Sequence, residues 1–174
     1  MRFFVLICSV TFAAIAAPTA AHAGEFFGGV YVHDVKLPTD KSGIEGGMDF
    51  QLGYRGGGIA HTPLEPYVFG ALNTAGKTDY ATIGLSAKFG GALYVRPGLG
   101  LAIHTGSARN FEDPSNDKIE FGSRILFEPE LGIGTEINDR LSVEASLVHM
   151  SHAQIFGREN PGIDNLGVRL NLKL

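Results

Sequence analysis

Apolar and polar residues alternate along most of the chain after residue 24. Between Leu166 and Leu174 every second residue is Leu or Val, and the residues between them are Gly, Arg, Asn and Lys. Such a period of two predicts β-strands with one apolar and one polar face. Alternating runs, most of them about ten residues long, occur at residues 26–36, 44–55, 66–75, 79–89, 93–103, 125–134, 141–147 and 166–174.

These eight runs predict an all-β protein, an eight-stranded antiparallel transmembrane barrel. A strand that crosses a membrane at a tilt needs about 9–11 residues. An even number of antiparallel strands can close into a barrel, so that no backbone group is left unpaired in lipid.

The connections between the runs differ in length. Gly90-Gly91 and Asn138-Asp139 predict tight hairpins at one end of the barrel, whereas 105–119 and 152–163 are long and polar and lie at the other end. Short turns at one end and long loops at the other are typical of outer-membrane barrels. Two connections depart from this pattern, because 56–65 is long and 73–78 is short.

The two faces of the runs have different charge. The polar face mixes glycines with charged residues that could pair across a narrow lumen, whereas the other face is almost free of charge. These charged residues are Arg96, Glu128, Glu130, Arg169 and Lys173. We therefore expect the apolar face to meet lipid. The alternative is a soluble, lipocalin-like barrel with its apolar face inside, which would carry a small apolar ligand.

The first residues have the pattern of a secretory signal peptide. Arg2 precedes an apolar stretch, and Ala21-His22-Ala23 forms a small-x-small cleavage site. We expect residues 1–23 to be removed and 24–174 to form one barrel domain. Loss of Arg2 takes the formal charge from −4 to −5, which does not indicate nucleic-acid binding. No metal-ligand spacing or nucleotide fingerprint is present, so we expect no metal and no cofactor.

Three chemically reactive residues continue the apolar face of the last two runs. The parity that begins at Leu141 reaches His149 and Ser151, and the same face of the following run, counted back from Leu166, includes Asp164. Because a slip of one residue would move a whole set to the other face, this parity is strongly constrained. The three side chains are expected to meet on the outside of the barrel, at its loop-bearing end.

These residue types suit acyl transfer. Ser151 would be the nucleophile, His149 the general base, and Asp164 would hold the imidazole in the required tautomer. Ionisable groups at membrane depth indicate a functional site. The alternative is a ring of polar residues where the strands leave the membrane, with no catalytic role.

Two segments resemble the lipid A 3-O-deacylases, a family of outer-membrane barrels. The first is His149-Met150-Ser151 followed by Asn160-Pro161-Gly162-Ile163-Asp164, and the second is Gly122–Glu128, which is similar to the sixth strand of the family. The resemblance is specific over residues 120–174 and architectural before them. It implies a carboxylic ester hydrolase in the outer membrane of a Gram-negative bacterium.

The implied reaction is hydrolysis of the ester-linked 3-O acyl chain of lipid A, the membrane anchor of lipopolysaccharide, by Ser151, His149 and Asp164 without a metal. The chain departs from the family in having Asp164 where Glu is frequent. Its loop is one residue longer, which makes Glu159 a second candidate for the acid.

The third departure is His152, which stands where the family usually has an Asn assigned to the oxyanion hole. Such a donor contributes about 2.7–4 kcal/mol to catalysis. His152 and Asn160 are the candidate auxiliary residues, with a backbone N–H as the other source of the donor. The alternative function is a non-enzymatic structural or adhesion barrel on the same scaffold.

Overall fold

The computed structural model describes residues 24–37, 43–109, 119–155 and 160–174. The expected signal peptide and Glu159 lie outside these residues. No helix within them is both long and apolar enough to cross a membrane. The strands are β1 (Glu25–Val32), β2 (Met48–Arg55), β3 (Leu64–Asn73), β4 (Tyr80–Ala87), β5 (Phe89–Gly90), β6 (Leu93–His104), β7 (Ile125–Glu136), β8 (Leu141–Met150) and β9 (Ile163–Lys173).

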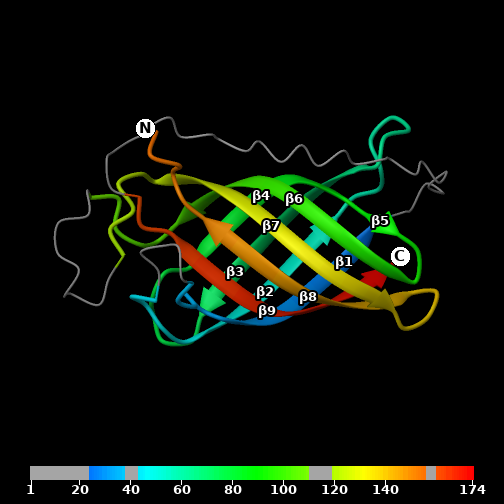
Figure 1. Cartoon of the computed structure of the whole chain (residues 1–174), viewed down its shortest axis with the longest axis horizontal. Coiled ribbons are helices and arrows are strands. Elements are labelled where there is room, and N and C mark those ends of the chain that lie inside the picture. Colours follow the sequence, from blue (N-terminus) through cyan, green and yellow to red (C-terminus); the bar gives the residue numbers. More distant parts are fainter. Residues whose placement is uncertain (1–23, 38–42, 110–118, 156–159) are drawn as a thin grey trace, which may run out of the picture.

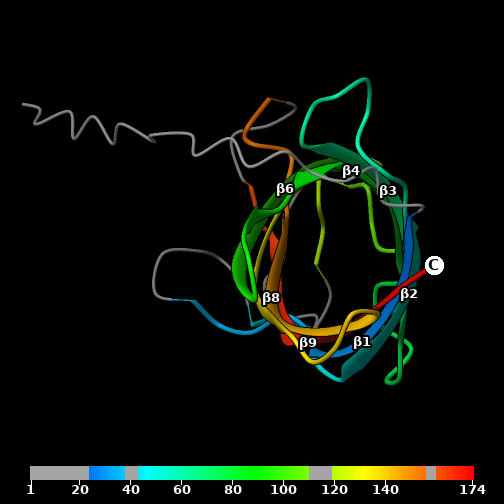
Figure 2. The ribbon, with the colours of Figure 1, turned by 90° about the vertical axis from the view of Figure 1, so that its right-hand side faces the viewer.

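The strands form one closed antiparallel sheet. Each pairs with its neighbour in the order β4-β3-β2-β1-β9-β8-β7-β6, and β4 pairs with β6 to close the ring (Figures 1 and 2). The short β5 continues β4 beyond Lys88 in the same register, since Ser86 lies opposite Gly98 and Phe89 opposite Val95. The predicted eight-stranded barrel is therefore confirmed.

The two ends of the barrel differ. The turn end carries the C-terminus and the β7–β8 turn, and the loop end carries the end of β8 and the start of β9 (Figure 1). At the loop end the first two predicted runs extend too far, because β1 ends at Val32 and β2 begins at Met48. Asp34 (φ 51°) and Gly47 (φ 107°) adopt left-handed backbone there, which ends the extended alternation.

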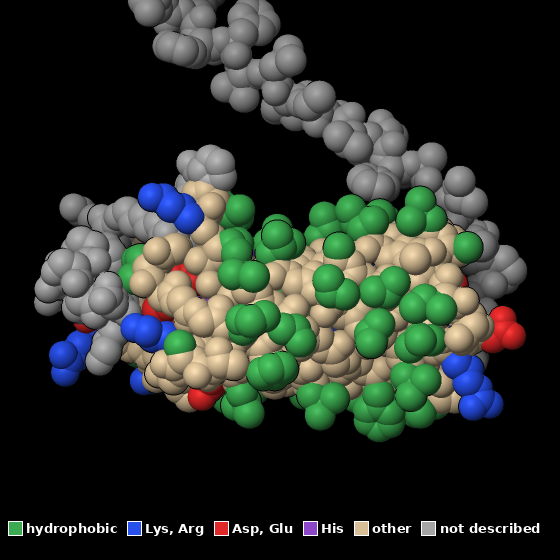
Figure 3. Space-filling view, turned by 90° about the horizontal axis from the view of Figure 1, so that it is seen from below, with side chains coloured by type: hydrophobic (Ala, Val, Ile, Leu, Met, Phe, Trp, Pro, Cys, Tyr) green, Lys and Arg blue, Asp and Glu red, His purple; other side chains and the backbone are tan. Residues whose placement is uncertain are grey.

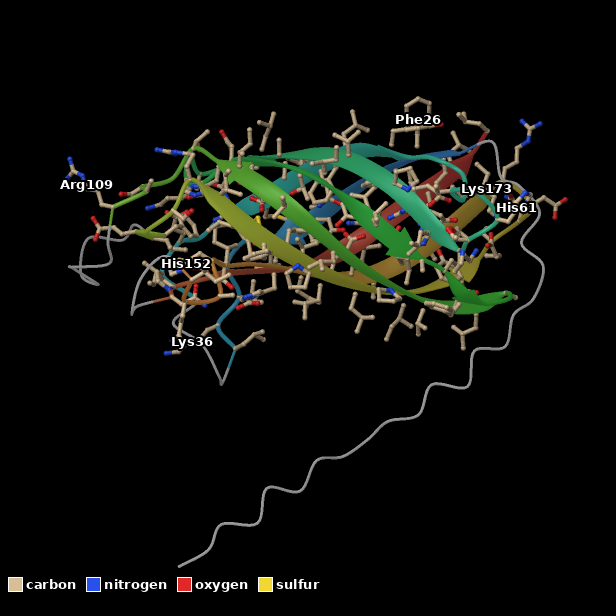
Figure 4. All side chains as sticks on the ribbon, turned by 90° about the horizontal axis from the view of Figure 1, so that it is seen from above. Phe26, Lys36, His61, Arg109, His152 and Lys173 are labelled. Carbon is tan, nitrogen blue, oxygen red and sulfur yellow. The ribbon has the colours of Figure 1, made fainter. Side chains whose placement is uncertain are left out.

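The apolar face of the strands points outward. Leu52 and Leu93 are 70% and 72% exposed, and the surface seen in Figure 3 carries hydrophobic side chains along most of its length, with charged ones near the ends. Figure 4 shows Phe26 directed away from the barrel. The soluble, lipocalin-like alternative is wrong, because it requires these side chains to fill the interior.

The lumen is filled by charged pairs, as the polar face predicted. Arg169 donates hydrogen bonds of 2.8 Å to Glu130 and 2.8 Å to Gln51. Arg96 donates to Glu25 at 2.8 Å and to Glu144 at 2.7 Å. Since buried charges require such partners, these contacts connect strands that are not neighbours in the sheet, and the bond from Arg96 on β6 to Glu25 on β1 joins opposite walls.

Inward-facing glycines make room for this filling. A Cβ at Gly134 would lie 2.5 Å from the ring of Tyr94, so no larger residue fits beside that ring. Toward the loop end, apolar side chains also fill part of the interior. These side chains are those of Tyr80, Ala102, Ile119, Phe121, Leu126, Val148, Met150 and Ile163.

Candidate active site

His149, Ser151 and Asp164 lie together on the outside of the loop end. His149 is the penultimate residue of β8 and pairs directly with Asp164 on β9. Ser151 follows β8 and has the same parity as His149. The structure thus brings together the three residues that the alternation placed on one face.

The three side chains form a continuous hydrogen-bonded chain. His149 Nδ1 lies 2.8 Å from Asp164 Oδ1, and His149 Nε2 lies 3.0 Å from Ser151 Oγ. Because a carboxylate accepts and does not donate, Nδ1 carries the proton, and Nε2 accepts from the serine hydroxyl. This is the geometry of a nucleophile beside a base whose tautomer is fixed by an acid.

The three groups differ in exposure. The side chain of His149 is 29% exposed, whereas that of Asp164 is 2% exposed. Ser151 is buried, with 6% of the residue accessible. The acid is therefore shielded beneath the imidazole, and the imidazole forms the open edge of the site.

Ser151 is held in place by β7. Its N–H donates to the carbonyl of Phe127 at 3.1 Å, and its carbonyl accepts from the N–H of Phe127 at 2.8 Å. This isolated bridge extends the pairing of β7 with β8 to Ser151, so the Ser151 side chain points outward like that of His149. Since the bridge occupies the Ser151 N–H, that group is not available to a substrate.

The segment after β1 is hydrogen-bonded to Asp164 and its neighbour Asn165. The N–H of Val35 donates to the backbone oxygen of Asp164 at 2.7 Å. The N–H of Asp34 donates to Asn165 Oδ1 at 2.9 Å, and Asp34 Oδ2 accepts from the N–H of Glu45 at 2.9 Å. The first loop is thereby attached to the strand that carries the acid.

A buried ion cluster ties this segment to the other loops. His33 lies 2.9 Å from Asp49 and 3.2 Å from Glu45, and Glu45 also accepts from the N–H groups of Thr78 and Ile119. Burial would lower the pKa of His33, but the hydrogen bonds to Asp49 and Glu45 outweigh it and raise the pKa to about 9. Burial likewise opposes ionisation of Glu45, yet its hydrogen bonds, led by that from His33, lower its pKa to about 2.

Gly162 packs against the imidazole. A Cβ at this position would lie 2.9 Å from His149 Cε1 and 3.0 Å from the carbonyl oxygen of Met150. A glycine is therefore required for close approach of the two strands beside the base. The sequence analysis identified Asn160-Pro161-Gly162 as part of a family-like motif and gave no signal of this contact.

The auxiliary candidates lie just beyond the serine. His152 is fully buried, and its N–H donates to Asn160 Oδ1 at 3.1 Å. A tight turn follows, in which Ala153 (φ 52°) and Gln154 (φ 60°) are left-handed and Ile155 N–H donates to the carbonyl of His152. Two successive non-glycine residues in this region indicate local backbone strain next to Ser151.

His104 and His61 lie apart from the site formed by Ser151, His149 and Asp164. The ring of His104 lies 4.3 Å from that of Phe121, between centroids, and its Nε2 lies 2.8 Å from the carbonyl of Ser123. His61 lies at the turn end, far from His152 (Figure 4). Within the described residues, no group of three His, Cys, Asp or Glu side chains is arranged to hold a metal ion.

Comparison with known families matches the chain to the model of the lipid A 3-O-deacylase (PagL) family. The match spans residues 64–173, more than half of the chain, and includes every member of the site. The chain belongs to this family. The resemblance extends further toward the N-terminus than the segment 120–174 that the motifs had suggested. A search of curated proteins found no match.

Solved structures agree on the fold of this lipid A 3-O-deacylase family member. The outer membrane enzyme PagL is 19% identical, with 86% of this chain and 99% of that chain covered and a TM-score of 0.56. Neisserial surface protein A is 13% identical, with 90% and 100% covered and a TM-score of 0.56. A de novo designed transmembrane β-barrel is 9% identical, with 89% and 98% covered and a TM-score of 0.53.

Family membership and the barrel architecture together confirm the expected location in the outer membrane. Because the loop end carries the long connections, it corresponds to the outer leaflet, where lipopolysaccharide lies. The roles of Ser151, His149 and Asp164 remain predictions that the geometry makes chemically possible.

Proposed function

We propose that the protein is an outer-membrane esterase that removes the 3-O-linked acyl chain of lipid A with Ser151 as nucleophile. The observation that supports this most strongly is the continuous contact from Asp164 through His149 to Ser151, on the lipid-facing side of a barrel from this family. A chance ring of interfacial polar residues would not require an acid, a base and a hydroxyl in this order.

The reaction proceeds in two steps. Ser151 Oγ attacks the ester carbonyl carbon while its proton passes to His149 Nε2. The C–O bond to the sugar then breaks, and the departing 3-hydroxyl oxygen takes the proton from His149, leaving the acyl chain on Ser151. Water attacks this acyl-enzyme with His149 again as base, which releases the fatty acid and restores the hydroxyl.

Asp164 holds the imidazole and stabilises its protonated form. Its shorter reach compared with Glu is sufficient, because β8 and β9 place His149 and Asp164 in direct cross-strand register. The contact of 2.8 Å needs no longer side chain. Substrate arrives laterally, with its acyl chains along the apolar wall formed by outward residues such as Leu131, Leu147 and Leu166.

Asn160 is our preferred side-chain donor for the oxyanion. Its Oδ1 accepts the N–H of His152, which leaves the amide –NH₂ as the donor end of the side chain. The imidazole of His152 is fully buried, so it is less suited to meet a substrate oxygen on the outer face.

The test is the lipid A composition of cells that express each variant. Ser151→Ala and His149→Ala should assemble normally and abolish loss of the hydroxyacyl chain, which mass spectrometry of lipid A measures directly. His61→Asn, at the turn end, is the matched histidine control and should process lipid A like the parent. Unchanged processing by Ser151→Ala would remove this residue from the mechanism.

A non-enzymatic structural or adhesion barrel is the second candidate, favoured by the presence of His152 where the family usually has Asn. The variant His152→Asn separates the two functions. A gain in deacylation would identify an enzyme tuned to low activity, whereas no activity in either form would support the structural role.

A further inference from the structure

A second feature of the outer wall lies on the far side of the barrel from Ser151. A hollow of about 640 Å³ extends across β2, β3, β4 and β6 toward the loop end. In the ring of strands, the β3–β4 pair is opposite the β8–β9 pair that carries the triad. Its volume falls within the range of about 300–1,000 Å³ that small-ligand sites have.

The floor of the hollow is made by two small residues. Across the strands, Gly70 pairs with Leu52 on one side and with Ala81 on the other, and Ala81 pairs with Ile103. The side chains of Leu52 and Ile103 therefore border a gap that is two strands wide. The walls are apolar, like the membrane interior that they face.

Packing does not require the glycine at position 70. Its φ lies outside the left-handed region, and within the described part of the chain a Cβ there would meet only the Tyr80 carbonyl oxygen, at 3.9 Å. The lumen-facing Gly53 and Gly84 differ, because a Cβ at either would lie 2.5 Å from an aromatic ring. The absence of a side chain at Gly70 therefore leaves room in the hollow on the outside of the barrel.

Arg124 lies at the edge of the hollow, where two hydrogen bonds hold its guanidinium in place. Arg124 Nη1 donates to the carbonyls of His104 and Gly106, both at 2.8 Å. The guanidinium is exposed, and among the described residues no carboxylate lies within ion-pair distance of it. Asp79 is the rim's acidic group, and its Oδ1 accepts the N–H of Asn73 at 2.7 Å.

We propose that this hollow is a second lipid site, which holds a phosphate-bearing lipid A molecule that is not the substrate. One acyl chain lies over Gly70 and Ala81, and a phosphate binds the free edge of Arg124. Arginine suits this role because its planar fork binds phosphate oxygens in pairs, and the two carbonyl contacts already restrict its motion. The proposal rests on the outer-membrane location but not on the chemistry of Ser151.

Binding is measured by native mass spectrometry on the full barrel in detergent, in a Ser151→Ala background that prevents turnover. The probes are bis-phosphorylated lipid A, dephosphorylated lipid A and phosphatidylglycerol. Gly70→Leu fills the hollow and should weaken binding of one lipid A molecule about tenfold, and Gly70→Ala should have a smaller effect. Arg124→Gln should weaken binding of phosphorylated lipid A about tenfold and leave the dephosphorylated form unchanged.

Thr135→Leu, outward on β7, and Arg140→Gln, at the turn end, are the volume and charge controls, and both should bind like the parent. Unchanged lipid A binding by a folded Gly70→Leu barrel would overturn the proposal, as would equally strong retention of phosphatidylglycerol. With Ser151 present, Gly70→Leu should deacylate like the parent. A protein without esterase activity would refute the proposed function and leave the lipid-binding comparison intact.

Discussion

The N–H of Val35 donates a 2.7 Å hydrogen bond to the backbone oxygen of Asp164. This bond joins the first outer loop to the strand that carries the proposed acid. Asp34 reinforces it from the neighbouring position, because its own N–H binds Asn165 and its carboxylate accepts the N–H groups of Ile44 and Glu45. The loop therefore acts as a support for Asp164.

Removal of that support should reduce activity while the barrel remains folded. Asp34→Ala deletes the acceptor that binds the N–H groups of Ile44 and Glu45, so the segment bonded to the backbone of Asp164 is held less firmly, and we expect a rate loss of about tenfold to a hundredfold. Asp34→Asn should retain most activity, because it keeps one acceptor oxygen and tolerates left-handed backbone. The decisive measurement is the split between kcat and KM for lipid A, because a less firmly held acid lowers kcat and leaves KM unchanged. An unchanged kcat in Asp34→Ala would contradict the supporting role.

The packing of the loops should depend on pH through His33 and Glu45. The pKa of His33 is raised from 6.5 to about 9, so its contribution to the stability of the loop packing is complete below pH 6.5. That contribution is lost as the pH rises through 9. The pKa of Glu45 is lowered from 4.5 to about 2, so its contribution is complete above pH 4.5 and is lost as the pH falls through 2. Hydrogen exchange at Thr78 and Ile119, whose N–H groups bind Glu45, should be slowest relative to the intrinsic rate between pH 4.5 and 6.5.

His33→Gln provides the comparison for this pH dependence. It should remove the change in protection between pH 6.5 and 9 and leave the strands of the barrel protected. A parent protein whose loop protection is constant over that interval would refute the role of the cluster.

The barrel could be predicted from sequence because one simple rule governs it. A wall between lipid and a polar lumen imposes a period of two, and Leu166–Leu174 shows that period without interruption. The strand ends at Asp34 and Gly47 could not be read in this way. They depend on left-handed backbone that is stabilised by contacts distant in sequence, such as the bond from Asp34 to Asn165.

The outward direction of His149, Ser151 and Asp164 was likewise predictable, since parity carries across a register that cannot slip. The burial of Ser151 and Asp164 was not. Both residues have neighbours on other strands or loops: Phe127 and Val35 hydrogen-bond to their backbones, and Gly162 packs beside Ser151. Such contacts leave no periodic signal in the sequence.

Gly162→Ala should separate the geometry of the site from the stability of the fold. The added Cβ would lie 2.9 Å from His149 Cε1, so the imidazole must move away from Ser151 or Asp164. We expect a loss of about a hundredfold in deacylation rate with an unchanged fold, measured with purified lipid A in detergent.

Gly91→Ala, where an added Cβ has no neighbour within 4 Å, is the matched glycine control. It lies at the turn end and should be fully active. Full activity in Gly162→Ala would show that Gly162, just before β9, does not fix the position of the imidazole.

Replacing Arg169 should destabilise the barrel without altering the triad. Arg169 binds Glu130 at 2.8 Å, and its guanidinium lies 4.6 Å from the ring centroid of Phe27. Among the described residues, Arg169→Met leaves Glu130 with only the longer ion-pair contact of 3.6 Å to Arg55, so we expect a loss of about 3 kcal/mol, at the lower end of the range for a broken buried pair. The double variant Arg169→Met/Glu130→Met should recover most of this loss, because no uncompensated carboxylate remains. Urea unfolding in lipid vesicles measures both, and a double variant as unstable as the single one would show that packing on Phe27 dominates.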